Sequence, residues 1–364
     1  SNNMSFDAGW QIKQLNLEYR EVFGGQEYTN LHSTPKIYST FFNITFNPNP
    51  IFYINTGLRA SKYNRYNNLL LNPTFGIKYN PISDLAIKVS MGRYSQFLYT
   101  INQEEELLRI VDFWQPIPDG EKPQEADHLI LGTEYWISNG NTISLEAYYK
   151  SYSSIYDLNP APDYSNIEET FALSGTAKAY GVEFLYRFNK NKFNGWLSYA
   201  YSNIRRTVDL NSDFILDNNK EIYPAKYDKP HSFNSLVSYQ INEKYSLGLS
   251  STIGSGQTYT PVIGKVHQAG VQAYGSLENP YSNFGNIYGI RNGARYPNYY
   301  RTDISLGRKS KVFGLDSELK FQIINITNHY NVLLYLWDHN SSPSRVEAYS
   351  MFPIIITFGW EFKI

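Results

Sequence analysis

The sequence predicts an all-β protein, a transmembrane antiparallel up-and-down β-barrel with about fourteen strands in this chain. Aromatic residues make up 16% of the 364 residues and charged residues only 18%, although about a quarter of the residues in a soluble domain are charged. Apolar and polar residues alternate with period two along most of the chain, which is the strand pattern. Tight polar turns alternate with long connections, as they do in outer-membrane barrels.

The period-two pattern is clearest at the C-terminal end of the sequence. One face of this segment is apolar and consists of Ile354, Ile356, Phe358, Trp360, Phe362 and Ile364. The residues between them are mostly polar, and the segment is long enough to cross a bilayer when tilted. The same alternation predicts strands at approximately residues 10–22, 35–47, 50–61, 71–81, 84–94, 127–138, 141–152, 176–189, 192–206, 229–242, 243–255, 298–309, 312–326 and 353–364. We expect one barrel region over residues 1–364, without a plug domain.

The connections between these strands predict two different rims. The tight turns fall at residues 47–50, 81–84, 138–141, 189–192, 242–244 and 309–311. The long connections fall at residues 23–34, 62–70, 95–126, 153–175, 207–228, 256–297 and 327–352. Because outer-membrane barrels have short periplasmic turns and long external loops, we expect a periplasmic C-terminus and extracellular long loops in a bacterial outer membrane.

The polar faces of the strands predict a lumen of mixed charge. The charged residues expected to face it are Arg59, Lys88, Glu134, Glu146, Glu183, Arg187, Arg301, Asp303, Glu318 and Lys320. Such a lumen suits water or a polar plug better than a packed apolar core. Soluble β-propellers and β-helices are disfavoured because the chain has no fixed repeat and its loops differ greatly in length. A two-sheet sandwich leaves the polar faces and the aromatic excess unexplained.

Several short motifs, in order and over most of the chain, resemble the barrel region of TonB-dependent outer-membrane receptors, in the style common in Bacteroidetes. They are residues 57–59 (GLR), 122–128 (KPQEADH), 175 (G), 181–184 (GVEF), 227–231 (YDKPH), 254–261 (GSGQTYTP), 295–303 (RYPNYYRTD) and 325–331 (NITNHYN). The resemblance implies a 22-stranded barrel around an N-terminal plug. It also implies energised import of a scarce nutrient, such as a siderophore, cobalamin, peptide or glycan, through TonB.

The sequence departs from that family pattern in two respects. We find no plug and no TonB box, and the chain ends in Ile364 instead of an aromatic residue. Since unpaired strand edges are not tolerated in lipid, we expect the plug and the remaining strands on a missing segment or a second chain. The alternatives are a self-contained passive channel of fourteen strands and a structural barrel subunit of an outer-membrane complex. Outer-membrane lipid is the expected surrounding partner, and a surface lipoprotein is a further candidate.

Aromatic and cationic residues of the predicted external loops are the candidates for ligand binding. They are Trp114, Tyr259, Tyr288, Arg291, Arg295, Tyr296 and Trp337. Rings and guanidinium groups can stack on a ligand and pair with its charges. The competing interpretation is an internal core of the loops or an aromatic belt at the membrane surface.

Enzymatic chemistry is not expected from this sequence. The six histidines are dispersed, there is no cysteine, and no nucleophile, phosphate-loop or zinc-hydrolase motif is present, so we expect no catalytic residue, metal or cofactor. Residues 104–106 (EEE) and the pair Asp338-His339 are interpreted as solvated loop residues. The net charge of −1 gives no field that would attract nucleic acid.

Overall fold

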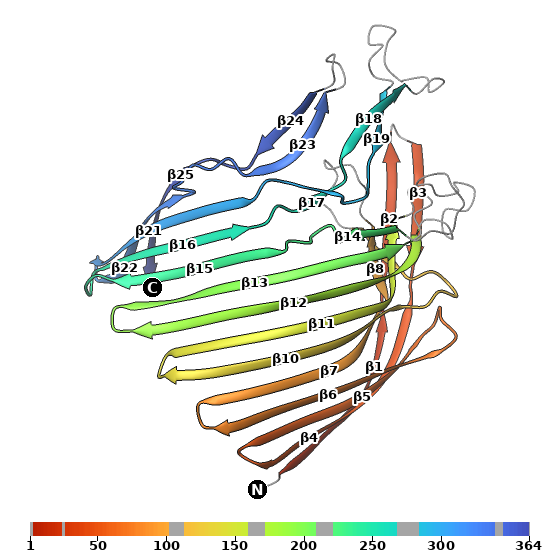
Figure 1. The fold of residues 1–364 in the computed structure, drawn as a ribbon, viewed down its shortest axis with the longest axis horizontal. Helices are drawn as coiled ribbons and strands as arrows, with labels where there is room; N and C mark the ends of the chain where they lie inside the picture. Colours follow the sequence, from red (N-terminus) through yellow and green to blue (C-terminus); the bar gives the residue numbers. More distant parts are fainter. Residues whose placement is uncertain are drawn as a thin grey trace. The chain divides into compact units, whose positions relative to one another are not determined.

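The computed structural model describes residues 3–23, 26–101, 113–158, 172–208, 221–267, 284–338 and 345–363, and all regular elements in these ranges are strands. None of these residues belongs to a helix that is long and apolar enough to cross a membrane. Fourteen long strands follow one another in sequence order in a single antiparallel sheet, to which the short β14 (Glu221–Pro224) adds by pairing with β13 (Figure 1). The predicted strand number and up-and-down order are therefore confirmed.

The long strands of the sheet have the following bounds. They are β1 (Met4–Gln14), β4 (Lys36–Asn49), β5 (Phe52–Tyr63), β6 (Leu69–Ile82), β7 (Leu85–Gln96), β10 (Gln124–Ser138), β11 (Asn141–Leu158), β12 (Ala172–Lys190), β13 (Phe193–Val208), β15 (His231–Gln240), β16 (Tyr245–Gly254), β21 (Tyr299–Val312), β22 (Leu315–Ile324) and β25 (Ile355–Lys363).

The long connections carry short strands that sequence analysis had treated as loops, except β2, most of which lay within the predicted strand 10–22. These strands form two-stranded pairs: β2 (Leu17–Phe23) with β3 (Gln26–Ser33), β8 (Leu98–Ile101) with β9 (Phe113–Pro116), β17 (Thr258–Tyr259) with β20 (Ala294–Arg295), β18 (Val262–His267) with β19 (Phe284–Tyr288), and β23 (Val332–Asp338) with β24 (Arg345–Ser350). The predicted alternation of tight turns and long connections is confirmed, because each tight turn joins two neighbouring long strands.

Two predicted boundaries were wrong. The first strand runs over Met4–Gln14 instead of 10–22, because the residues from Leu17 onward pair with β3 in a separate hairpin. The apolar positions change phase at Gln14, from Trp10 and Ile12 to Leu15, Leu17 and Tyr19, and the prediction did not use this signal of the break. The last tight turn lies at Phe313 and Gly314 instead of 309–311, and both residues have positive φ, at 51° and 82°. This left-handed pair is the backbone of a two-residue hairpin turn.

The chain divides into two compact units. Unit 1 comprises Ser1–Tyr135, Glu146–Gly181 and Ile204–Ile222, and unit 2 comprises Trp136–Leu145, Val182–Asn203 and Tyr223–Ile364. Strands of the large sheet occur in both units. The prediction of a single barrel region over residues 1–364 stays a prediction.

The apolar face of the strands is exposed in each unit. In unit 1, Trp10 is 78% exposed and Phe6 60%, and in unit 2, Phe358 is 70% exposed and Ile356 65%. The register aligns this face across neighbouring strands: Leu319 lies opposite Trp360, and Phe321 lies opposite Phe358. An apolar face of this extent needs an apolar environment, which a bilayer provides.

Candidate functional site

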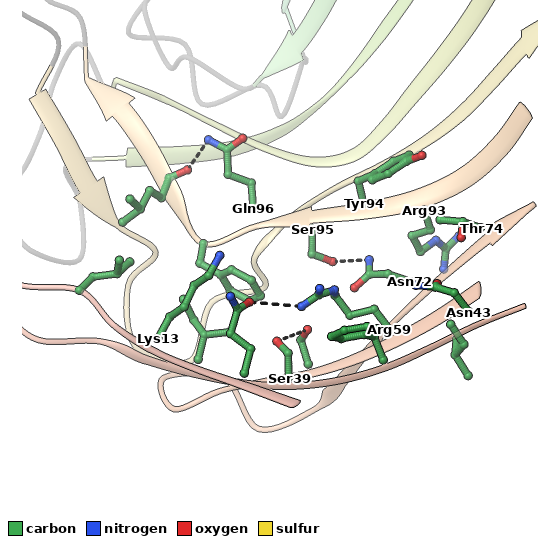
Figure 2. Close-up of a pocket in the computed structure, with 18 of the residues that line it drawn as sticks. Lys13, Ser39, Asn43, Arg59, Asn72, Thr74, Arg93, Tyr94, Ser95 and Gln96 are labelled. Carbon is green, nitrogen blue, oxygen red and sulfur yellow. Dashed lines mark hydrogen bonds between the residues drawn. The ribbon is translucent and has the colours of Figure 1, made fainter. Parts of the chain in front are cut away.

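A cavity of about 720 Å³ lies on the polar face of unit 1, between β1, β4, β5, β6, the end of β7 and the β8–β9 hairpin. Figure 2 shows polar side chains from several strands pointing into this space. Its polar and charged lining consists of Gln11, Lys13, Ser39, Asn43, Arg59, Ser61, Asn72, Thr74, Arg93, Ser95 and Gln96. Its rings come from Phe41, Tyr94, Phe97 and Trp114. We call this space the inner-face cavity.

Strand register explains why these residues meet. Every second residue of a strand lies on the same face, and paired residues on neighbouring strands lie side by side. Gln11 pairs with Ser39, Ser39 with Ser61, and Arg59 with both Phe41 and Asn72. Direct hydrogen bonds strengthen this layer, since the hydroxyl groups of Ser39 and Ser61 lie 2.9 Å apart. The amide of Asn72 donates to the Ser95 hydroxyl over 2.8 Å.

Three cationic side chains line the cavity, Lys13, Arg59 and Arg93, and a carboxylate pairs with Arg93. Arg93 forms a two-bond pair with Asp127, with donor–acceptor distances of 2.7 and 2.9 Å. Arg59 has weaker contacts, because its Nη1 reaches Gln11 Oε1 at 3.5 Å and its guanidinium lies 5.1 Å from the centre of the Phe41 ring. Among the described residues, no carboxylate lines the cavity. No Asp or Glu side chain in this part of the chain forms an ion pair with Arg59 or Lys13. An oxyanion would therefore find both a guanidinium fork and an ammonium group.

A small buried core fixes the β8–β9 hairpin beside the cavity. Ile37, Tyr63, Tyr99, Ile117 and Tyr156 form this core, with Tyr63 and Ile117 fully buried. The Tyr63 hydroxyl donates to the Ile117 carbonyl over 3.0 Å. Burial raises the pKa of Tyr99 to about 12, so this hairpin residue is neutral at physiological pH. The anchoring holds Trp114, which pairs with Thr100, at the cavity.

Arg295, a predicted ligand residue in unit 2, is fixed by an internal ion pair. It donates from Nη2 to the carboxylate of Asp228, a residue with no exposed surface. Its Nη1 also donates to the Asp228 carbonyl over 2.6 Å. These bonds connect the 227–231 and 295–303 motifs. The arrangement gives Arg295 a structural role, whatever else it contacts.

Three tyrosines form an aromatic cluster in the same unit. The ring centres of Tyr259 and Tyr296 lie 4.6 Å apart, and Tyr335 lies 5.4 Å from the first and 5.1 Å from the second. Tyr335 was not a sequence candidate, although it lies two residues before the candidate Trp337. The sequence had offered a loop core as the alternative to ligand contact, and this cluster fits that alternative.

The other loop candidates lie at separate positions. Tyr288 is 38% exposed and pairs with Val262, and Trp337 is 37% exposed and pairs with Val346. Arg291 lies over the ring of Tyr223, 5.7 Å from its centre. Trp114 is the one sequence candidate for ligand binding among the residues that line the inner-face cavity. Ligand contact by all seven candidates stays a prediction.

The predicted lumen charges share the polar face of their strands, and several form ion pairs there. Lys88 lies 2.6 Å from Glu134, Arg301 pairs with Asp303 at 2.7 Å, and Lys320 pairs with Glu361 at 2.8 Å. Glu318 lies opposite Lys309 and Glu361 in the sheet. By strand alternation, Glu146 shares a face with Tyr148, and Glu183 shares a face with Arg187. Orientation toward a lumen stays a prediction.

Sequence reasoning missed Lys13, Gln11, Asn72 and Tyr94 as members of one site. The sequence does show that each of these residues occupies a polar-face position in the alternation of its strand. This alternation does not show which strands lie next to which loop. No cluster of metal-ligating side chains occurs in the described ranges. Residues 104–106 and His339 lie outside the described residues.

Comparison with known families identifies the barrel. Residues 2–328 match the family model described as TonB dependent receptor-like, beta-barrel. No curated protein sequence matches that of the chain.

Similar solved structures have the same fold. The ferripyoverdine receptor of the Pseudomonas aeruginosa outer membrane superposes with a TM-score of 0.59 at 11% identity, over 92% of this chain and 39% of that one. The ferric-catecholate import receptor Fiu from Escherichia coli K12 gives 0.57 at 13% identity, over 91% and 49%. The Escherichia coli outer-membrane transporter YddB gives 0.58 at 10% identity, over 99% and 51%. The chain thus spans 39 to 51% of the length of these relatives.

Proposed function

The chain belongs to the family of TonB-dependent receptor β-barrels, and we propose that it is the barrel part of an outer-membrane receptor that imports a scarce nutrient by TonB-coupled transport. The observation that carries this proposal is the family match over residues 2–328, joined to fourteen long antiparallel strands with an exposed apolar face. The tight turns face the periplasm and the long connections face the medium. The receptor performs no covalent chemistry.

The plug that closes such a barrel, the remaining strands and the contact with TonB lie on a segment outside this chain or on a second chain. The support is coverage, because the chain spans 39 to 51% of the length of the similar receptors. Together these parts form the 22-stranded barrel that the family resemblance implies. A surface lipoprotein is a further candidate partner.

The inner-face cavity of unit 1 is the proposed contact site for the nutrient, and the loop candidates of unit 2 are separate candidates for ligand binding. Arg59 and Lys13 provide positive charge without a described carboxylate partner, and Phe41, Tyr94 and Trp114 provide rings. This chemistry favours a ligand that carries both an oxyanion and a flat apolar part. Siderophores and cobalamin derivatives meet this description better than neutral glycans do.

The test is uptake by cells that carry or lack the complete receptor. Radiolabelled ferric chelates, cobalamin, an oligopeptide and an oligosaccharide are supplied one at a time, with and without TonB. We expect accumulation of one class against its gradient, lost without TonB and reduced at least tenfold by Arg59→Gln. Arg301→Gln is the matched control, because Asp303 already occupies that guanidinium. Equilibration that is independent of TonB would instead establish a passive channel.

A further inference from the structure

Three aromatic side chains, Tyr94, His128 and Tyr152, form a continuous cluster on the polar face of unit 1, which we call the ring cluster. The ring centres of Tyr94 and His128 lie 4.8 Å apart, and the Tyr152 ring centre lies 6.3 Å from that of His128 in an edge-on arrangement. These residues come from β7, β10 and β11, which are successive neighbours in the sheet. Tyr94 also lines the inner-face cavity, so the ring cluster continues the cavity across the sheet (Figure 2).

Strand register places the ring cluster on the same face as Arg59. Arg59 pairs with Asn72 on β6, and Thr74, two residues further along β6, pairs with Gly92. Gly92 pairs in turn with His128. Because alternate residues of a strand share a face, all of these residues lie on the polar face. Two strand spacings, about 10 Å, separate Arg59 from the β7 member of the cluster, so one ligand can reach both.

The Tyr94 ring lies along the sheet instead of standing away from it. A Cβ atom built on Gly92 would lie 3.0 Å from the Tyr94 hydroxyl oxygen, so the outer end of the ring covers this glycine. Phe41 covers Gly9 in the same way, since a Cβ atom there would lie 2.7 Å from Phe41 Cζ. Tyr94 is nevertheless 47% exposed, because the ring face that points away from the sheet stays accessible.

The polar atoms of the ring cluster have no hydrogen-bond partner in the described part of the chain. No described residue hydrogen-bonds to the hydroxyl of Tyr94 or Tyr152, or to a ring nitrogen of His128. By contrast, the core residues Tyr63 and Tyr156 each donate to a backbone carbonyl. A cluster that only stabilised the sheet would need neither an accessible ring face nor available hydrogen-bonding groups, whereas a ligand site uses both.

We propose that the ring cluster makes the proposed nutrient site selective for aromatic ligands, with Tyr94 and His128 stacking on a flat ring of the ligand while Arg59 binds its anionic group. The inference rests on the proposed function and deepens it, because it names the residues that set the ligand class. An aromatic ring gains stacking at these faces that an aliphatic ring of equal charge does not, about twofold to tenfold in affinity for each stacked pair. The cavity volume of about 720 Å³ is typical of sites that hold small molecules.

The experiment compares two carboxylates that differ in ring saturation, 2-naphthoate and decahydro-2-naphthoate. Equilibrium dialysis of the complete receptor in detergent, against micelles without receptor, gives the two dissociation constants. We expect wild type to bind 2-naphthoate at least fivefold more tightly. The saturated probe enters detergent and apolar surfaces at least as readily as the aromatic one, so neither the micelle nor the apolar strand face can produce this preference.

Variants locate the preference in the ring cluster. Tyr94→Leu combined with His128→Leu should reduce it below twofold, whereas Tyr94→Phe should keep it because stacking does not need the hydroxyl. Tyr135→Leu is the matched control, since Tyr135 also lies on β10 but is 44% exposed on the apolar face. Arg59→Gln should weaken the binding of both probes by the same factor and leave the preference intact. Heat-modifiable migration on gels checks that each variant folds.

The outcomes separate this inference from the proposed function. Equal binding or no binding of the two probes by wild type overturns the inference, and so does an unchanged preference in the double variant or an equal loss in Tyr135→Leu. TonB-dependent uptake is measured separately. Uptake without an aromatic preference refutes the inference alone, whereas an aromatic preference without TonB-dependent uptake of any nutrient refutes the proposed function.

Discussion

At the scale of single residues, the pairing of each arginine determines its role. Arg93 and Arg301 each donate two or more hydrogen bonds to one carboxylate, and Arg295 is fixed by Asp228. Arg59, like Arg301, is on the polar face of its strand, but no described carboxylate forms an ion pair with it. The sequence predicted the face of Arg59 and Arg301 by parity alone, and parity cannot distinguish a neutralised guanidinium from one that is free for a ligand.

Removing the cation beside Asp228 tests the structural role of Arg295. We expect Arg295→Gln to lower the free energy of unfolding by about 3 kcal/mol, because the buried carboxylate loses its charge partner. Lys311→Gln is the control and should cost less than about 1 kcal/mol, since both side chains of its pair are largely exposed. Urea titrations of the receptor in lipid vesicles measure both values. Equal losses of unfolding free energy in the two variants would show that the buried Asp228 carboxylate does not need the Arg295 charge for stability.

At the scale of elements, hairpin turns set the ends of the strands. The sequence located five of the six tight turns, because Asn, Pro, Gly and Ser mark them clearly. It misplaced the last one, since Lys309-Ser310-Lys311 is polar whereas Phe313 is an aromatic residue that has positive φ and is 97% exposed. Cross-strand register from Val312 and Leu315 onward imposes this turn, despite the unfavourable residue.

Substitutions in this turn should change stability in opposite directions. Phe313→Asn should stabilise the β21–β22 hairpin by about 0.5 to 1 kcal/mol, because asparagine adopts the left-handed conformation more easily. Gly314→Ala should destabilise it by about 1 kcal/mol or more, because φ there is 82°. Hydrogen exchange of the hairpin amides reports both changes. A destabilising Phe313→Asn would mean that the ring makes a stabilising contact, for instance with lipid.

At the scale of the whole molecule, the same strands present two chemically different faces. Leu249 and Ser250 are neighbours on β16, and their register partners on β21 are Ile304 and Asp303. One residue belongs to the apolar face and the next to the polar one. This inside-out pattern accounts for an aromatic content of 16% without a large buried core.

Charge placed on each face in turn tests membrane insertion. Leu249→Arg should destabilise the protein in a bilayer by about 2 to 4 kcal/mol, because the guanidinium would lie in hydrocarbon near the middle of the strand. Ser250→Arg adds the same group one residue away on the polar face and should cost less than about 1 kcal/mol. Refolding into phospholipid vesicles along a urea gradient gives both values. Tolerance of Leu249→Arg would contradict the lipid-facing assignment.

The sequence by itself determined the strand number, the order of tight turns and long connections, and the face of each alternating residue. These properties follow from period two and from local turn chemistry, which neighbouring residues decide. Only the tertiary structure decided that Lys13, Arg59 and Trp114 line one cavity, that Asp228 holds Arg295, and that Tyr94, His128 and Tyr152 form one ring cluster. Each of these sites joins residues from separate strands or hairpins, and their proximity depends on cross-strand register and on hairpins within the long connections, neither of which has a local signature.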